Sequence, residues 1–531
     1  MVCVRPGLEA KKTRIRKKGL DVTKPASTQR KAGVLLSYAY SVAQVLVYLV
    51  YVPLLLSGIG RDEYGLYQFV GSAAAYIVSI SNILSFGVGR FYSKYFAEND
   101  QKNMENTLAI SKRLYWALSG IGFLLFGVLA VGVQFAYAGS FSQSQLNECS
   151  AMLMVLAANT MVTMNNTINS AAITVNERFI FQRALQLAVL VAQPILVVVL
   201  IQFFPNALTV TVAVLVLNIA NASIQRIYAQ SVLKTRYTYH GWDKELAIGL
   251  VKFSGAILLV TIADQVFWNA DQLIIGYFYD AGAIAIYAVG AQIYKAYIPI
   301  GTAVSGVFFP KVSRLWFQYH DMEAIEDLLI KVGRIAAYVL LLVLSGFSVF
   351  GRDFIDLWVG PDYWQAYWIA LIVMAPFTID LIQNLWLTLL QVMNKYLFKG
   401  IIYSIIAVCN IFLTIWAIGP FGMLGAAAST GFSFLIGNGF IMNWYYAHVI
   451  GIDVGRFWSN ILRIFFPVVV LAAVAFLCWT WLDGAIAMTW PVFFIGVGMY
   501  LLLYLLVTYR VCMNDYERGL LGRLLPIRKG R

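Results

Sequence analysis

Two aspartates interrupt a long apolar stretch, each within an Ala-Asp-Gln triplet. Asp264 and Asp271 are seven residues apart in LAIGLVKFSGAILLVTIADQVFWNADQLIIGYF. Seven residues turn an α-helix by about 700°, so the two carboxylates share one face within about 20° and differ in depth by about 10.5 Å. A charge at the centre of a bilayer costs roughly 2.5–3.5 kcal/mol on insertion scales, so it is retained where it faces a cavity or a partner. We predict that this pair couples transport to a cation, either H⁺ or Na⁺.

Two further ionisable side chains are expected at the depth of Asp264. Lys295 and Asp380 each lie about 21–23 Å along the helix from the outer end of their own apolar stretch, at 1.5 Å per residue. Three ionisable groups at one depth predict a polar cavity, with Asn384 one turn beyond Asp380. A structural ion pair between Asp264 and Lys295 is the alternative. Asp271 lies nearer the surface and is expected to be a solvated residue at the mouth.

The first half of the chain carries neutral polar stripes instead of mid-membrane charges. Asn159 and Asn166 are a heptad apart, and Gln44 follows Ser37 and Ser41 at helical spacing. Such side chains suit sugar hydroxyls, and they equally suit hydrogen bonds between helices in a dry bundle. The sequence leaves both interpretations open.

The elements that position these residues are membrane helices. The chain has 531 residues, 60% hydrophobic and 12% charged, and the charged share is about half that of a soluble protein. A bilayer core about 30 Å thick needs about 20 apolar residues in a helix. Fourteen stretches qualify: 33–57, 66–92, 114–137, 146–172, 182–204, 208–232, 247–278, 281–309, 330–351, 365–392, 396–419, 423–448, 458–482 and 487–509. We predict an all-α polytopic membrane protein with about 14 transmembrane helices.

Positive charge predicts the orientation. All but four of the 39 Lys and Arg residues fall on one side of this arrangement, with Arg61 and Arg352 on the other side and Lys252 and Lys295 within spans. Cytoplasmic loops carry the excess of Lys and Arg, so both termini are expected to be cytoplasmic, in a cell inner (plasma) membrane. The net charge of +13 is therefore a topology signal. Nucleic-acid binding is not expected, because there is no basic soluble domain.

An internal repeat divides the chain. The sequence around Tyr67 reappears around Tyr287, which predicts two parallel lobes of six spans each, 32–245 and 246–450. Spans within 451–510 form an appendage, and basic cytoplasmic tails are expected at 1–31 and 511–531. The loops leave no room for a soluble catalytic domain, so an enzyme is not expected. The five cysteines are scattered without the spacing of a metal site or disulfide framework.

Three segments resemble a known family. Residues 53–100, 270–315 and 409–430, the last reading CNIFLTIWAIGPFGMLGAAAST, resemble the polysaccharide transport branch of the multidrug/oligosaccharidyl-lipid/polysaccharide exporter superfamily. The resemblance spans roughly residues 33–450. It implies two six-helix lobes around a central cavity. It also implies that undecaprenyl-pyrophosphate-linked oligosaccharide is flipped from the inner to the outer leaflet by alternating access, for surface polysaccharide biosynthesis. Polysaccharide assembly proteins are candidate partners, alongside membrane lipids.

This resemblance suggests roles for the cations. Lys295 would meet the pyrophosphate, and Arg90 and Lys252 would guide it into the cavity, although both suit ordinary positive-inside anchors. A cation-coupled multidrug antiporter of the same superfamily is the alternative function. A membrane-embedded polymerase or ligase is a third, because acidic residues cluster in the outer loop near Asp353 and Asp356.

Overall fold

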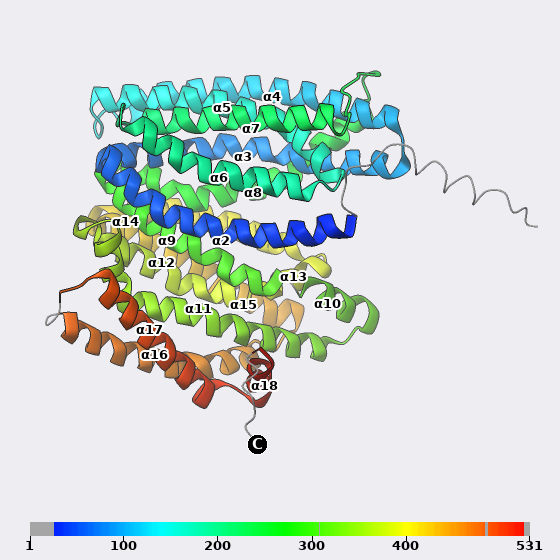
Figure 1. Cartoon of the computed structure of the whole chain (residues 1–531). Coiled ribbons are helices and arrows are strands. Elements are labelled where there is room, and N and C mark those ends of the chain that lie inside the picture. The colour runs from blue at the N-terminus through cyan, green and yellow to red at the C-terminus, as the bar shows by residue number, and fades with distance from the viewer. Residues whose placement is uncertain (1–25, 307, 484–486, 525–531) are drawn as a thin grey trace, which may run out of the picture.

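The protein is built from helices. The computed structural model describes residues 26–306, 308–483 and 487–524, and within these ranges there is no strand (Figure 1). Ten of the described helices are long and apolar enough to cross a membrane. Most of the N-terminal tail 1–31 and the last seven residues lie outside the described part, whereas α18 (Asp515–Leu524) begins the C-terminal tail. The chain is therefore an all-helical polytopic membrane protein.

The first group of helices forms one bundle, drawn in blue to green in the upper part of Figure 1. It contains α2 (Ala26–Ile59), α3 (Arg61–Glu98), α4 (Gln101–Ala136), α5 (Gln143–Val175), α6 (Phe179–Ile201) and α7 (Ala207–Ser231). Helix α5 packs between α4 and α7, and α2 packs on α6. Short polar turns begin the helices: Asn206 caps α7 by accepting from the Thr209 amide, and Ser142 opens α5 with a capping box.

A second group of helices follows in the chain. It contains α8 (Lys244–Phe278), α9 (Ala281–Gly306), α10 (Phe309–Arg314), η2 (Leu315–Tyr319), α11 (Met322–Trp358), η3 (Pro361–Tyr363), α12 (Gln365–Ile382), α13 (Asn384–Val392), α14 (Tyr396–Phe434), η4 (Leu435–Ile441), α15 (Met442–Tyr445) and η5 (Tyr446–Ile450). Helix α8 runs beside α3 of the first group as well as beside α14. Helix α8, the first of the second group, is thus packed against helices of both groups.

Helix α14 is two helical arms joined at a sharp kink. Pro420 lies inside it, and Gly422 has φ 61° and ψ −145°, which is not helical. A Cβ atom at Gly425 would lie 2.3 Å from the Ala417 carbonyl oxygen, so the two arms come closer than any larger residue allows. The kink turns the chain back and places the second arm beside the first.

A seam between α3 and the second group lies at the end of the molecule that the sequence predicts to be outer; we call it the α3 seam. Arg61 Nε donates a hydrogen bond to the Gly282 carbonyl oxygen at 3.1 Å. A Cβ atom at Gly65 would lie only 1.8 Å from the Ala281 carbonyl oxygen, so glycine is required for this approach.

Two side-chain hydrogen bonds continue the α3 seam toward the middle of the molecule. Gln292 Nε2 donates to Tyr64 Oη at 2.6 Å, and Ser72 Oγ donates to Gln272 Oε1 at 2.5 Å. Tyr64 is completely buried. The two groups of helices are therefore closed against each other along this half of α3.

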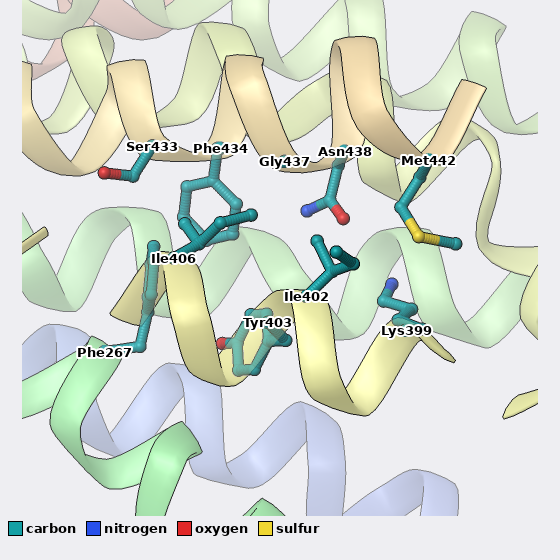
Figure 2. A pocket seen from close by; sticks show the side chains of 10 residues that line it. All are labelled: Phe267, Lys399, Ile402, Tyr403, Ile406, Ser433, Phe434, Gly437, Asn438 and Met442. Carbon is teal, nitrogen blue, oxygen red and sulfur yellow. The ribbon is translucent and has the colours of Figure 1, made fainter. Parts of the chain in front are cut away.

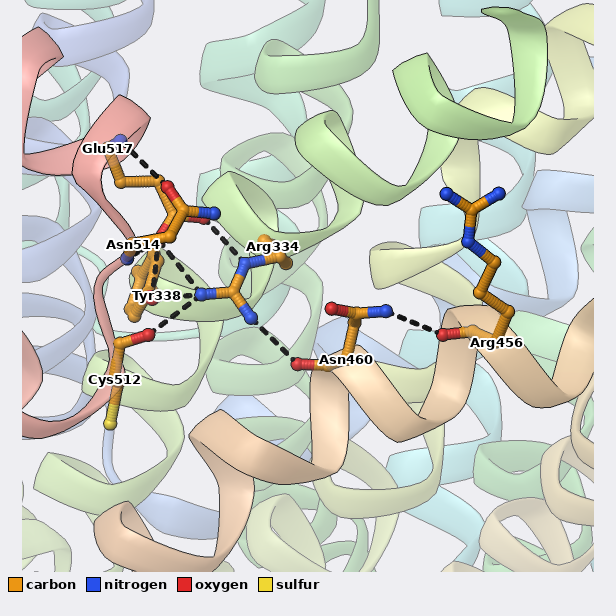
Figure 3. A network of polar contacts seen from close by, with 7 residues as sticks. All are labelled: Arg334, Tyr338, Arg456, Asn460, Cys512, Asn514 and Glu517. Atoms are coloured by element: carbon orange, nitrogen blue, oxygen red, sulfur yellow. Dashed lines mark hydrogen bonds and ion pairs between the residues drawn. The ribbon is translucent and has the colours of Figure 1, made fainter. Parts of the chain in front are cut away.

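A buried ion pair anchors the last helices, α16 (Val454–Asp483), α17 (Trp490–Val507), η6 (Thr508–Cys512) and α18. Arg334 of α11 contacts Glu517 of α18 at 2.6 Å, and both side chains are 6% exposed (Figure 3). The guanidinium also donates to the carbonyl oxygens of Asn460 and Cys512 at 3.0 and 2.8 Å. One arginine thus joins α11, α16, η6 and α18.

Replacing Glu517 should destabilise this anchor. Glu517→Gln leaves the Arg334 guanidinium buried without a counter-charge, and such a loss costs about 3–5 kcal/mol. The matched control is Asp327→Asn, because the Asp327–Arg456 pair is more than 40% exposed on both sides and such pairs contribute at most about 1 kcal/mol. Thermal unfolding of the purified protein measures both changes. Equal effects of the two substitutions would contradict the anchor.

The anchor should also weaken in acid. Burial raises the pKa of Glu517, but hydrogen bonds from Arg334 and the Asn514 amide outweigh it and hold this pKa below its ordinary value of 4.5. A lowered folded-state pKa means that the stabilisation is complete above pH 4.5 and is lost as the pH falls through the lowered pKa. The pH dependence of wild-type unfolding in this range should therefore be reduced in Glu517→Gln.

Candidate functional site

The Asp271 carboxylate is the centre of a buried polar cluster. Asp271 on α8 is 4% exposed. It accepts hydrogen bonds from Tyr287 Oη at 2.5 Å, Thr430 Oγ1 at 2.7 Å and Thr414 Oγ1 at 3.1 Å. Tyr287 comes from α9, and the two threonines come from the two arms of α14. The sequence-based expectation of a solvated mouth residue is wrong, because the folded arms of α14 and helix α9 cover this carboxylate.

The cluster extends along the two arms of α14. Asn410 Nδ2 donates to Thr430 Oγ1 at 3.2 Å, and Ser433 Oγ donates to Asn410 Oδ1 at 3.1 Å. All of these side chains are buried. We call Asp271, Tyr287, Thr414, Thr430, Asn410 and Ser433 the Asp271 network. It offers one carboxylate and several neutral oxygens, the kind of atoms that bind a proton or a hard cation.

Sequence reasoning missed most of the Asp271 network. Asn410 and Thr414 are four residues apart, and Thr430 and Ser433 three apart, so each pair shares a helix face. Those spacings were the available signal. They do not reveal that Pro420 and the kink at Gly422 bring the two faces to one carboxylate.

Asp264 lies two turns below Asp271 on α8 and has different partners. It accepts from Trp268 Nε1 at 3.1 Å and from Tyr403 Oη at 3.2 Å. Lys295 is partly buried on α9. Within the part of the chain that the structure describes, Lys295 has no ion pair and no hydrogen bond. Asp264 and Lys295, the structural pair considered as an alternative, thus make no ion-pair contact in this structure, although the two groups act on each other electrostatically.

Asp380 is paired with a lysine that sequence analysis did not single out. Lys399 Nζ lies 2.9 Å from Asp380 Oδ1, with side-chain exposures of 11% and 21%. Asp264 and Asp380 both act electrostatically on Tyr403, which lies one turn after Lys399 on α14. Asn384 is partly buried at the start of α13. The carboxylates thus gather around α14, and Lys295 remains apart from their ion pairs.

The polar residues of the first bundle are mostly bonded to one another. Asn218 of α7 donates to Asn159 at 2.8 Å, and Asn169 donates to Asn166 at 3.1 Å. The first contact joins α7 to α5, as expected for asparagines that link helices, whereas the second lies within α5. Gln44 is partly buried on α2.

Arg90 and Lys252 are the two side chains expected to guide pyrophosphate into the cavity, and the structure describes the side chain of Arg90 alone. Arg90 is exposed near the end of α3, with its guanidinium 5.9 Å from the Phe91 ring. Lys252 lies in a part of α8 whose side chains are outside the described residues.

Known structures share this fold. The solved structure of the lipid II flippase MurJ in an inward closed conformation superimposes with a TM-score of 0.70 and 15% sequence identity, covering 92% of this chain and 100% of that chain. An inward-facing multidrug resistance MATE family transporter of the MOP superfamily gives a TM-score of 0.61 and 12% identity, covering 78% of this chain and 96% of that one. Curated proteins gave no match.

A family assignment comes from the sequence itself. The family described as polysaccharide biosynthesis protein matches residues 60–368, which is more than half of the chain and runs from α3 into α12. The match includes Asp264, Asp271 and Lys295. This multi-pass membrane protein therefore belongs to the polysaccharide biosynthesis protein family and has the fold of MOP-superfamily transporters.

Proposed function

We propose that this protein is a flippase that moves undecaprenyl-pyrophosphate-linked oligosaccharide from the inner to the outer leaflet by alternating access. The observation that carries the proposal is the family match over residues 60–368. The likeness to a lipid II flippase supports it at the level of the fold. A cation-coupled multidrug antiporter is the alternative, and the polysaccharide family match favours the flippase.

The acidic residues near Asp353 and Asp356 suggested a polymerase or ligase, and the contacts of Asp353 do not support that function. Asp353 Oδ2 accepts a hydrogen bond from Trp479 Nε1 of α16 at 2.5 Å. This contact ties α11 to the last helices, so Asp353 has a structural partner. Asp353 therefore gives no reason to assign catalysis to this loop.

We further propose fourteen spans in a plasma membrane, with both termini cytoplasmic. Ten helical segments qualify by length and composition, and one of them, Tyr396–Ile450, contains the kink at Gly422. Dividing that segment at the kink and adding α3, α5 and α8, which are 38, 33 and 35 residues long, gives fourteen. Residues 32–245 and 246–450 would then be the two lobes and 451–510 the appendage.

The Asp271 network is proposed as the site of the coupling cation, H⁺ or Na⁺. A cation bound there would draw together α8, α9 and both arms of α14, since each contributes an oxygen. The next residue, Gln272, is bonded to Ser72 of α3 across the α3 seam. Binding of a cation at Asp271 and closure of the α3 seam would therefore be linked through two neighbouring residues of α8.

Lys295 is proposed to bind the pyrophosphate. Its ammonium has no ion pair within the described residues. Lys295 lies on α9, three residues after Gln292, which is bonded to Tyr64 across the α3 seam. A partly buried lysine without an ion pair or a hydrogen bond can place its ammonium on an anionic group of a substrate. Asp264 acts electrostatically on Lys295, but its hydrogen bonds are to Trp268 and Tyr403.

Neutralising Asp271 should remove ion coupling. We expect Asp271→Asn to lower flipping by at least about tenfold and to abolish its dependence on a Na⁺ or proton gradient, since the amide cannot balance a cation's charge. A fluorescent lipid-linked glycan in proteoliposomes measures this. Asp327→Asn, on the exposed pair with Arg456, is the control and should behave as wild type. Unaltered gradient dependence in Asp271→Asn would remove Asp271 from the coupling site.

Removing the Lys295 charge should weaken substrate binding without altering the ion. Lys295→Ala is expected to raise the KM for the pyrophosphate-linked substrate by about tenfold, with Lys295→Arg intermediate. Because Asp264 and Lys295 make no ion-pair contact in this structure, adding Asp264→Asn should not restore Lys295→Ala. Restoration by the double substitution would show that a structural pair exists in another state.

A further inference from the structure

A narrow pocket lies inside the second bundle, between the first arm of α14 and the π-helical segment η4 (Figure 2). It has room for about one water molecule. Ser433 lies at one end and Asn438 and Lys399 at the other, with Ile402, Ile406 and Phe434 between them. We call it the η4 pocket.

Both ends of the η4 pocket are polar and each belongs to a charged cluster. Ser433 is part of the Asp271 network, so a chain of hydrogen bonds runs from the Asp271 carboxylate to the pocket. At the other end, Lys399 is paired with Asp380 at 2.9 Å. The sequence of α14 places Lys399 nearer than Ser433 to the predicted inner side. The pocket therefore lies between the proposed cation site and a second carboxylate.

The Asn438 amide points into the η4 pocket without a partner. Its side chain is visible there in Figure 2, and the residue is 6% exposed. Among the described residues, its side chain has no hydrogen bond. A buried amide without a partner is costly and calls for a water or an ion. The Asn438 amide is therefore available to hydrogen-bond a water molecule or an ion in the pocket.

An apolar contact divides the η4 pocket in the middle. A Cβ atom at Gly437 would lie 2.2 Å from Ile406 Cδ1, so the Ile406 side chain packs directly against the glycine backbone. Gly437 lies in the π-helical turn, a feature that is frequent at functional sites. The Ile406 side chain lies between Ser433 and Asn438 in Figure 2, and an apolar constriction can block water and ions.

We propose that the η4 pocket is the inner part of the route by which the coupling cation moves between the cytoplasm and Asp271, with Ile406 on Gly437 as its gate. Asp380 is the next carboxylate on this route, and Lys399 neutralises it between ion passages. The route runs inside one bundle, whereas Lys295 has no contact with the pocket. The cation then exchanges without crossing the path of the lipid-linked substrate. This inference rests on the proposed role of Asp271 in ion coupling.

Cysteine accessibility tests the route without requiring transport. Ser433→Cys and Asn438→Cys are introduced separately into full-length protein whose five native cysteines are replaced by alanine. A membrane-impermeant methanethiosulfonate reagent is added to the cytoplasmic face of inside-out vesicles. We expect Asn438→Cys to react, and Ser433→Cys to react slowly.

The gate is tested by changing Ile406. With Ile406→Ser, labelling of Ser433→Cys should accelerate by about tenfold, because the hydroxyl admits water to the constriction. Ile406→Val keeps the apolar contact and should leave the rate unchanged. Ile406→Thr is the second polar variant, and thermal unfolding identifies any variant that does not fold.

Two results would overturn the route. One is labelling of Ser433→Cys that is the same with isoleucine, serine and threonine at position 406. The other is an Asn438→Cys that is inert from the cytoplasmic face while Lys295→Cys reacts. The proposed function fails separately: if Asp271→Asn keeps its gradient dependence while the gate responds to Ile406, the pathway is hydrated but does not serve Asp271.

Discussion

One buried carboxylate constrains the second bundle. Asp271 is surrounded by hydroxyls from Tyr287, Thr414 and Thr430, and a charge in this low-dielectric interior is tolerated only while those donors stay in place. The hydroxyls come from three separate helical segments. Any movement of α9 or of either arm of α14 therefore changes the environment of the carboxylate, and any change of charge at the carboxylate acts on all three segments.

The residues next to Asp271 extend this constraint to the rest of the molecule. Gln272 bonds to Ser72 across the α3 seam, and Gly65 lets α3 approach the Ala281 backbone at the same end. Asp264, two turns away on α8, reaches Tyr403 of α14. A single helix thus carries the buried carboxylate, the contact between bundles, and the second carboxylate. For the proposed cation site, this arrangement would connect ion binding to a change of access through contiguous hydrogen bonds and backbone contacts.

The sequence allowed the helical membrane fold and the shared face of Asp264 and Asp271 to be predicted, since both follow from local periodicity and composition. It did not allow the partners of Asp271 to be predicted. Thr430 is 159 residues away along the chain and reaches the carboxylate only because α14 folds back at Gly422. Depth along the helices placed Asp380 at the level of Lys295. In the structure, Asp380 is paired instead with Lys399, which lies 19 residues further along the chain. The turn between α13 and α14 brings these two residues together, and helical spacing alone does not reveal it.

Cation binding to the purified protein tests the central claim most directly. A ligand that binds the folded state raises its thermal stability in proportion to occupancy. The unfolding temperature of the wild type is expected to respond to added Na⁺ or to pH in the range where the site fills. Asp264→Asn should keep that response and Asp271→Asn should lose it. An undiminished response in Asp271→Asn would contradict the claim that the Asp271 network is where the coupling cation binds.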